Sequence, residues 1–425
     1  MSDRVPRLGG ERAGLVAPFR GERYRNRSRL SGLIAPPYDV IAPSERPMYA
    51  DRDRHNIVHL TLPATDGDPY TRAAGLLADW RSAGVFVRDR VPSLYVLRQE
   101  FTTPEGHRHV RTGVIGGVAA EPFVNGRVKP HEKTHPAPKD DRLALLRAAQ
   151  ATFEALLVCA RDEDGTLRGM LEKATQNRPL ARAELTGVKI ALWRVAGQQA
   201  RALAAAASQG ALYIADGHHR YETAVAYREE NPAADRVPAL IVSLSDPGLL
   251  VLPTHRLVYG GPVDGMAVVN ELRERFQIRE LLSQANYADE LATLRNRGTA
   301  CVVVLPGGKA QAFLLKGGAS LGDLPFANQP AVASLDVARI DELIVKRLLA
   351  SAGDVGRIDY SADPHHVIDE VQRGDAAAGV LLNPTAVEQV LAVADAGATM
   401  PQKSTYFMPK VPSGLVIMGY EDRQP

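Results

Sequence analysis

The feature that most constrains the fold is a short apolar segment that runs into a glycine turn and then into a helical segment. Residues 211–215 (Ala-Leu-Tyr-Ile-Ala) have the composition of a buried strand, and residues 218–230 have helical spacing. Asp216 and Gly217 separate the two segments. Because glycine lets the backbone turn sharply and lets a ligand approach closely, the sequence predicts a strand, a tight turn and a helix in direct succession.

The first turn of this helix carries groups that suit phosphate. A helix N-terminus presents free N–H groups and the positive end of the helix dipole. His218, His219 and Arg220 add side-chain donors. Asp216 precedes them as a candidate ligand of Mg²⁺, which prefers few carboxylates together with phosphate and water. The structural alternative is that Asp216 caps the helix and that the basic residues face solvent.

Two other segments are candidates for the same site. Residues 129–135 (Lys-Pro-His-Glu-Lys-Thr-His) surround Glu132 with cations, so that this carboxylate stays ionised and could accept a proton from a substrate hydroxyl. Near the C-terminus, Lys403, Ser404 and Thr405 could bind a carboxylate or a phosphate. For both segments, a solvated surface loop is the alternative.

The chain of 425 residues has the composition of a globular protein with two or three domains. Helical and strand patterns alternate without a fixed repeat, which predicts a mixed α+β and α/β fold. We expect an α+β unit over residues 1–120, a phosphate-binding core over 121–260 and an α+β unit over 261–425. Within the first unit, the pattern of residues 57–62 predicts a strand.

Composition excludes several classes of protein. The formal net charge is only +2, and no helix-turn-helix pattern is recognisable, so a nucleic-acid partner is not expected. The sequence has no apolar run of membrane-spanning length, and we expect no membrane partner. The N-terminal residues lack the pattern of a signal peptide. Cys159 and Cys301 lie in apolar runs, which favours buried, reduced thiols and a cytoplasmic protein.

Three segments resemble, in the same order, those of the small archaeal free serine kinase. They are residues 129–132 (Lys-Pro-His-Glu), residues 216–220 (Asp-Gly-His-His-Arg) with the strand that follows, and the stretch 379–416 that contains Lys403 and Thr405. The C-terminal box reads Lys-Ser-Thr-Tyr-Phe here, whereas the kinase has Lys-Thr-Thr-Arg-His.

Two broader resemblances accompany this one. Residues 214–220 are similar to the phosphate-binding box of ParB/sulfiredoxin-like proteins. The whole chain also resembles a bacterial family known as domain of unknown function 1015. Its hallmarks here are residues 35–39 (Ala-Pro-Pro-Tyr-Asp), the loop that contains His131 and Glu132, and residues 400–410. The resemblance implies a ParB/sulfiredoxin-like nucleotide-binding core with added N-terminal and C-terminal α+β units.

The resemblance also implies a reaction, which is transfer of a phosphoryl group from ADP or ATP to the hydroxyl of free L-serine or a related hydroxy acid. Glu132 would be the catalytic base, and Asp216 would bind magnesium or help to activate the nucleophile. The run from Gly217 through His218 and His219 to Arg220 would bind nucleotide phosphates. The loop of Lys403, Ser404 and Thr405 would hold the carboxylate or phosphate of the substrate.

Two alternatives use the same phosphate site. One is a phosphatase or nucleotidase, in which water takes the place of the acceptor. The other is a non-catalytic, ParB-like nucleotide-binding protein. A kinase differs from both in needing a second, water-excluding place for the acceptor.

Overall fold

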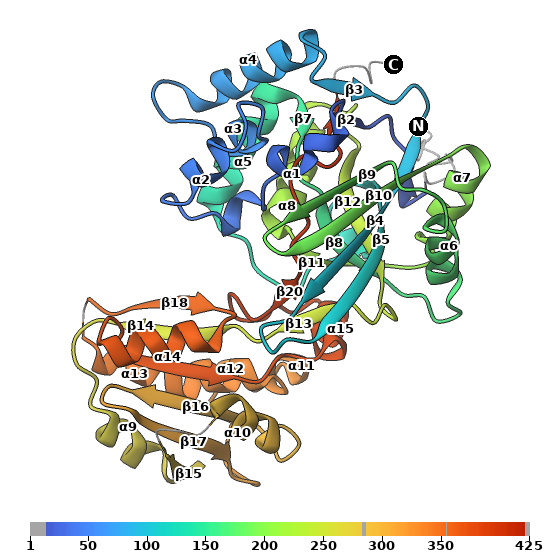
Figure 1. The fold of residues 1–425 in the computed structure, drawn as a ribbon. Helices are drawn as coiled ribbons and strands as arrows, with labels where there is room; N and C mark the ends of the chain where they lie inside the picture. The colour runs from blue at the N-terminus through green and yellow to red at the C-terminus, as the bar shows by residue number, and fades with distance from the viewer. Residues whose placement is uncertain (1–13, 283–285, 354, 421–425) are drawn as a thin grey trace, which may run out of the picture.

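The computed structural model describes residues 14–282, 286–353 and 355–420, which form a large and a small lobe (Figure 1). The large lobe surrounds a nine-stranded mixed sheet, and the small lobe surrounds a six-stranded antiparallel sheet. The expected mixed α/β architecture is therefore confirmed.

The order of strands in the large sheet is β6-β11-β8-β12-β5-β4-β10-β9, with β1 beside β5. β8 runs parallel to β12 and β6 runs parallel to β11, whereas the other pairs are antiparallel. The strands are β1 (Val16–Ala17), β4 (Ser93–Thr102), β5 (Arg108–Ala119), β6 (Val128–Lys129), β8 (Leu156–Ala160), β9 (Ala181–Leu185), β10 (Val188–Ala196), β11 (Leu212–Asp216) and β12 (Arg236–Ser243).

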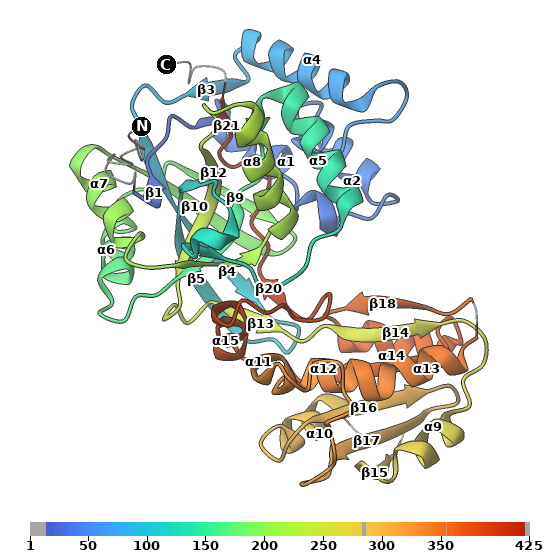
Figure 2. The same cartoon turned by 180° about the vertical axis from the view of Figure 1, so that it is seen from behind.

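Both faces of this sheet are buried, because side chains point alternately to its two sides and those on each side join a hydrophobic cluster. In β8, Leu156 and Val158 join one hydrophobic cluster, while Leu157 and Cys159 join the other. α6 (Thr166–Ala174) and α7 (Gly197–Ala206) cover the first face. On the other side, α5 (Pro136–Ala149) joins the second cluster, and α4 (Pro69–Ser82) packs against α5 (Figures 1 and 2). α8 (His218–Glu230) follows β11. Both cysteines are buried and free, as expected.

Short helices precede the sheet. They are η1 (Arg27–Arg29), α1 (Leu30–Leu33), η2 (Tyr38–Val40), α2 (Arg46–Ala50) and α3 (Val58–Thr61). The prediction of a strand at residues 57–62 was wrong, since α3 is helical. A short apolar run that is buried on all sides does not reveal its period, and here the Asn56 side chain accepts the Val58 N–H at 3.0 Å and starts a helix.

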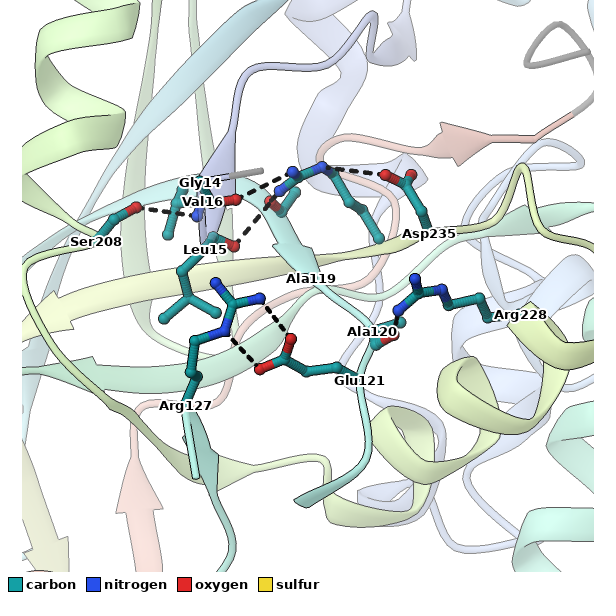
Figure 3. A network of polar contacts seen from close by, with 12 residues as sticks. Gly14, Leu15, Val16, Ala119, Ala120, Glu121, Arg127, Ser208, Arg228 and Asp235 are labelled. Carbon is teal, nitrogen blue, oxygen red and sulfur yellow. Dashed lines mark hydrogen bonds and ion pairs between the residues drawn. The ribbon is translucent and has the colours of Figure 1, made fainter. Parts of the chain in front are cut away.

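The first described strand is tied to the body of the large lobe by polar contacts. Figure 3 shows the Val16 N–H donating to the Ser208 hydroxyl at 3.0 Å, and the ion pair of Arg127 with Glu121. Arg228 donates to the Ala120 carbonyl in the same view. The contacts of Glu121 and Ala120 flank η3 (Phe123–Asn125), the connection that leads from β5 to β6.

The small-lobe sheet has the order β15-β17-β16-β19-β14-β18. Its strands are β14 (His255–Tyr259), β15 (Phe276–Leu281), β16 (Ala300–Leu305), β17 (Lys309–Leu315), β18 (Arg357–Ser361) and β19 (Ala378–Leu382). One face packs on α10 (Tyr287–Leu294) and α14 (Pro364–Arg373). The other packs on α9 (Gly265–Leu272), α12 (Asp336–Ile340), the π-helical turn η4 (Asp341–Val345) and α13 (Lys346–Ser351). α11 (Pro330–Ala333) and α15 (Val387–Asp395) lie toward the large lobe (Figure 2).

The chain crosses between the lobes twice, and the two crossings pair with each other. β13 (Leu250–Leu252) leads into the small lobe and is antiparallel to β20 (Tyr406–Met408), which leads back. In the large lobe, β21 (Met418–Gly419) then pairs with β7 (Ala151–Thr152), and β2 (Glu22–Tyr24) pairs with β3 (Phe86–Arg88). Among the described residues, no helix is long and apolar enough to cross a membrane.

The strand pairings can be compared with the boundaries of the three expected units. The boundary near residue 120 separates β5 from β6, two strands of one sheet, so the first two units share their sheet. The boundary near residue 260 falls just after β14, which belongs to the small lobe. The last residues of the third unit return to the large lobe through β20 and β21.

Candidate functional site

A cavity of about 490 Å³ brings together most of the residues that the sequence singles out. Glu132, the run 216–220, Lys403 and Thr405 all line it. They come from the loop after β6, the junction of β11 with α8, and the segment before β20. β18 contributes the small-lobe wall, so that residues of both lobes face one space.

The turn between β11 and α8 depends on glycine. Gly217 has φ +96°, in the left-handed region, and precedes α8 without a side-chain cap. A Cβ atom placed there would lie 2.7 Å from Cδ2 of Leu156 and 3.1 Å from the guanidinium carbon of Arg220. Gly217 therefore lets the helix start close to β8 and leaves its first N–H groups at the cavity, since Gly217 itself lines it.

Replacing Gly217 with alanine tests this turn against a matched control. Gly126 also has positive φ, +71°, but a Cβ atom there would meet nothing within 4 Å. Both substitutions carry a left-handed strain of about 1–2 kcal/mol, and only Gly217→Ala adds contacts with Leu156 and Arg220. We expect urea denaturation to show the larger loss of stability for Gly217→Ala. Equal losses in the two variants would contradict the close packing at Gly217.

Asp216 lies in an ion triad of which Arg220 is buried and the other two members are partly buried. One carboxylate oxygen is 2.5 Å from Nζ of Lys410 and the other is 2.8 Å from Nη2 of Arg220. Burial alone would raise the pKa of Asp216, but the charges of Lys410 and Arg220 outweigh burial and hold it well below its usual range. Arg220 also donates to the Ala155 carbonyl at 3.0 Å, which fixes the guanidinium under the first turn of α8.

This arrangement fits poorly with Asp216 as a magnesium ligand. Both of its oxygens already accept from cations, which compete with a metal ion for the same lone pairs. Across the described ranges, His, Cys, Asp and Glu side chains form no group of three or more that could hold a metal ion. The described residues therefore do not fit a metal held by the protein alone, and the predicted Mg²⁺ would require the phosphates of a nucleotide as its main ligands.

His218 and His131 are buried against each other. Their ring centroids lie 4.6 Å apart in an edge-to-face arrangement, and the backbone N–H of His131 donates to Nε2 of His218 at 3.4 Å. Burial lowers the pKa of each imidazole to about 3, so both are neutral at pH 7. Because Nε2 of His218 is an acceptor, its neutral ring carries the proton on Nδ1, which lies 3.9 Å from Oε2 of Glu132. His218 thus faces Glu132 as a neutral donor and not as a cation.

His219 is half-buried at the mouth of the same turn. Its Nε2 accepts a hydrogen bond from the backbone N–H of His135 at 2.9 Å, and burial lowers the pKa of His219. This bond joins α8 to the loop that carries Glu132, so the phosphate-binding candidates and the candidate base are held in one frame.

Glu132 is fixed by the returning C-terminal segment. It forms a parallel β-bridge with Met400, and its Oε1 accepts the Lys403 N–H at 3.2 Å. Thr405 lies 3.1 Å from Nε2 of His131 through its hydroxyl. Ser404 does not line the cavity; its buried hydroxyl donates to the Pro401 carbonyl at 2.6 Å. The structure therefore gathers Lys403 and Thr405 with Glu132 and leaves Ser404 out.

Several lining residues are not among the site residues that the sequence predicts. Lys410 pairs with Asp216, and the exposed Asp39 and half-buried Tyr38 line the wall beside α8. Thr254 and Tyr360 come from the small lobe. The neighbouring prolines indicated only a turn at Tyr38 and Asp39, and no local pattern connects β18 with Glu132 or with the turn at Gly217.

Comparisons with known proteins place the chain in a family. It belongs to the family described as Protein of unknown function (DUF1015), whose model matches residues 16–338. No curated protein matches it.

Solved structures similar to this chain include three that each overlap 70% of it. A free serine kinase in complex with AMP is 15% identical, with a TM-score of 0.35 over 91% of its own chain. A conserved hypothetical protein from Pyrococcus furiosus is 17% identical, with a TM-score of 0.35 over 94%. SbnI with C-terminal truncation from Staphylococcus aureus is 14% identical, with a TM-score of 0.36 over 87%.

Proposed function

We propose that the protein is a nucleotide-dependent phosphotransferase that moves a phosphoryl group from ADP or ATP to the hydroxyl of a small acceptor such as free L-serine. One observation carries the proposal, which is the cavity that places the open N-terminus of α8 and the carboxylate of Glu132 on the same space. Phosphoryl transfer needs positioning and neutralisation of charge more than covalent chemistry, and these are the parts that the cavity offers.

The roles follow from the contacts. The N–H groups after Gly217 and the positive end of the α8 dipole would bind phosphate oxygens, with His219 beside them. Arg220 and Lys410 form ion pairs with Asp216. They would therefore stabilise bound phosphate through their charge and hold the turn at Gly217 in place. The core that carries these residues would then be of the ParB/sulfiredoxin-like type. Mg²⁺, if it takes part, would arrive with the nucleotide and shield its phosphates.

Glu132 would accept the proton of the acceptor hydroxyl. Its Oε1 is held by the Lys403 N–H, and its Oε2 faces the neutral His218 ring, so the carboxylate is oriented by groups that carry no competing negative charge. Lys403 and Thr405 would bind the carboxylate of a serine-like acceptor next to this base. Ser404 is not part of the proposal.

The test is direct formation of a phosphorylated acceptor. The protein is incubated with ATP or ADP, Mg²⁺ and L-serine, and the products are followed by ³¹P NMR and mass spectrometry. We expect O-phospho-L-serine that depends on both nucleotide and serine. Release of inorganic phosphate without a phosphorylated acceptor, over a panel of hydroxy amino acids and hydroxy acids, would favour a phosphatase or nucleotidase. Nucleotide binding without turnover would favour a non-catalytic protein.

A further inference from the structure

We infer that Thr254, at the entry to the small lobe, is a substrate-binding residue that makes a hydrogen bond to the acceptor molecule. The inference rests on the proposed function and deepens it, because it assigns recognition of the acceptor to the small lobe. Thr254 directly precedes β14 and lines the cavity that contains Glu132.

The hydroxyl of Thr254 is buried without a partner. The residue is 6% exposed, and among the described residues no donor or acceptor bonds to its Oγ1. Most buried polar side chains are paired, because a buried hydroxyl that has lost its water costs free energy. Because Thr254 also lines the cavity, a ligand bound there is the group that could supply the missing bond.

Thr254 is held rigidly. The neighbouring Arg256, which is 1% exposed, forms a two-point ion pair with Asp341 at 2.8 Å for each contact. The same guanidinium donates to the Thr254 carbonyl. A binding group fixed by a buried ion pair loses little further freedom when a ligand arrives, which favours recognition.

The contacts place Thr254 on the acceptor side of the cavity. Arg256 donates to the Lys403 carbonyl at 3.4 Å, so one guanidinium joins Thr254 to the loop that also holds Glu132. The phosphate-binding candidates lie on α8 in the large lobe and, within the described residues, make no hydrogen bond to Thr254. Thr254 therefore belongs with the base and the Lys403 loop.

The chemistry of this wall points to a small polar acceptor. Tyr360, opposite Arg256 in the β14–β18 register, lines the same cavity, and its ring lies 5.4 Å from that guanidinium. Arg256 is paired with Asp341, which neutralises its charge. Thr254 and Tyr360 therefore contribute uncharged hydroxyl groups to the cavity. Hydroxyls bind an ionised group beside the reacting hydroxyl, as in an amino acid or hydroxy acid, and reject analogues that lack it.

The test compares Thr254→Val with two other variants. Valine keeps the shape of threonine and removes its hydrogen bond, whereas Thr254→Ser keeps the hydroxyl. Thr103→Val is the matched control, because Thr103 is 7% exposed with an equally unpaired hydroxyl but does not line the cavity. We expect Thr254→Val to raise KM for L-serine about 10-fold or more with KM for the nucleotide unchanged. Thr254→Ser and Thr103→Val should stay within about twofold of the native protein.

Two outcomes would overturn the inference. An unchanged KM for L-serine in Thr254→Val would mean that a bound water satisfies the hydroxyl, and a raised KM for the nucleotide alone would move Thr254 to the donor site. Titration calorimetry with L-serine separates this inference from the proposed function, since it needs no turnover. If the native protein binds serine but transfers no phosphoryl group, and Thr254→Val weakens that binding, the kinase proposal is refuted and the binding role of Thr254 stands. Absence of serine binding to the native protein would refute both.

Discussion

Glu132→Gln is expected to lower kcat by roughly 10²-fold or more while leaving nucleotide affinity unchanged. Glutamine keeps the size of the side chain and its acceptor for the Lys403 N–H, but it cannot take up the proton of the acceptor hydroxyl. The measurement is steady-state kinetics with L-serine, together with nucleotide binding by titration calorimetry.

The control for this variant is Glu230→Gln, at the far end of α8. Glu230 is exposed and pairs with Arg147, so its loss should leave kcat within about twofold. Full activity in Glu132→Gln would remove Glu132 from the mechanism. Loss of nucleotide binding in that variant would instead assign Glu132 to the donor site.

Asp216→Asn is expected to destabilise the protein by up to roughly 3–5 kcal/mol, because it leaves the buried Arg220 and the partly buried Lys410 without their shared carboxylate. The free energy of unfolding is measured by urea denaturation at pH 7. Since the folded-state pKa of Asp216 lies below its unfolded value, this stabilisation is present above about pH 4 and is lost as the pH falls toward the folded-state pKa.

A second substitution distinguishes Asp216 as an ion-pair partner from Asp216 as a metal ligand. Adding Lys410→Met to Asp216→Asn removes one of the uncompensated charges, so the double variant should be more stable than the sum of the two single losses predicts. If Asp216 is instead a magnesium ligand, Asp216→Asn will shift the Mg²⁺ titration of activity while the urea midpoint stays where it is in the native protein.

The cavity could be predicted in part from local sequence. Asp216 and Gly217 between a strand and a helix have the conformation that their residue types require, since only glycine adopts φ +96° there without strain. The position of Glu132 beside this turn could not be read from the sequence. It depends on the β-bridge with Met400, 268 positions away, and on the His135 N–H that bonds to His219.

The sequence by itself determined the strand, the turn and the helix that carry the phosphate-binding candidates. These follow from backbone preferences and from the period of apolar residues, which act over a few positions. Only the tertiary structure decided the protonation states of the site residues and the contacts that their side chains make. Burial makes His218 neutral, pairing commits Asp216 to Lys410 and Arg220, and the second crossing between the lobes brings Thr254 and Lys403 to one guanidinium. Desolvation and Coulomb interactions depend on neighbours in space, and those neighbours are distant along the chain.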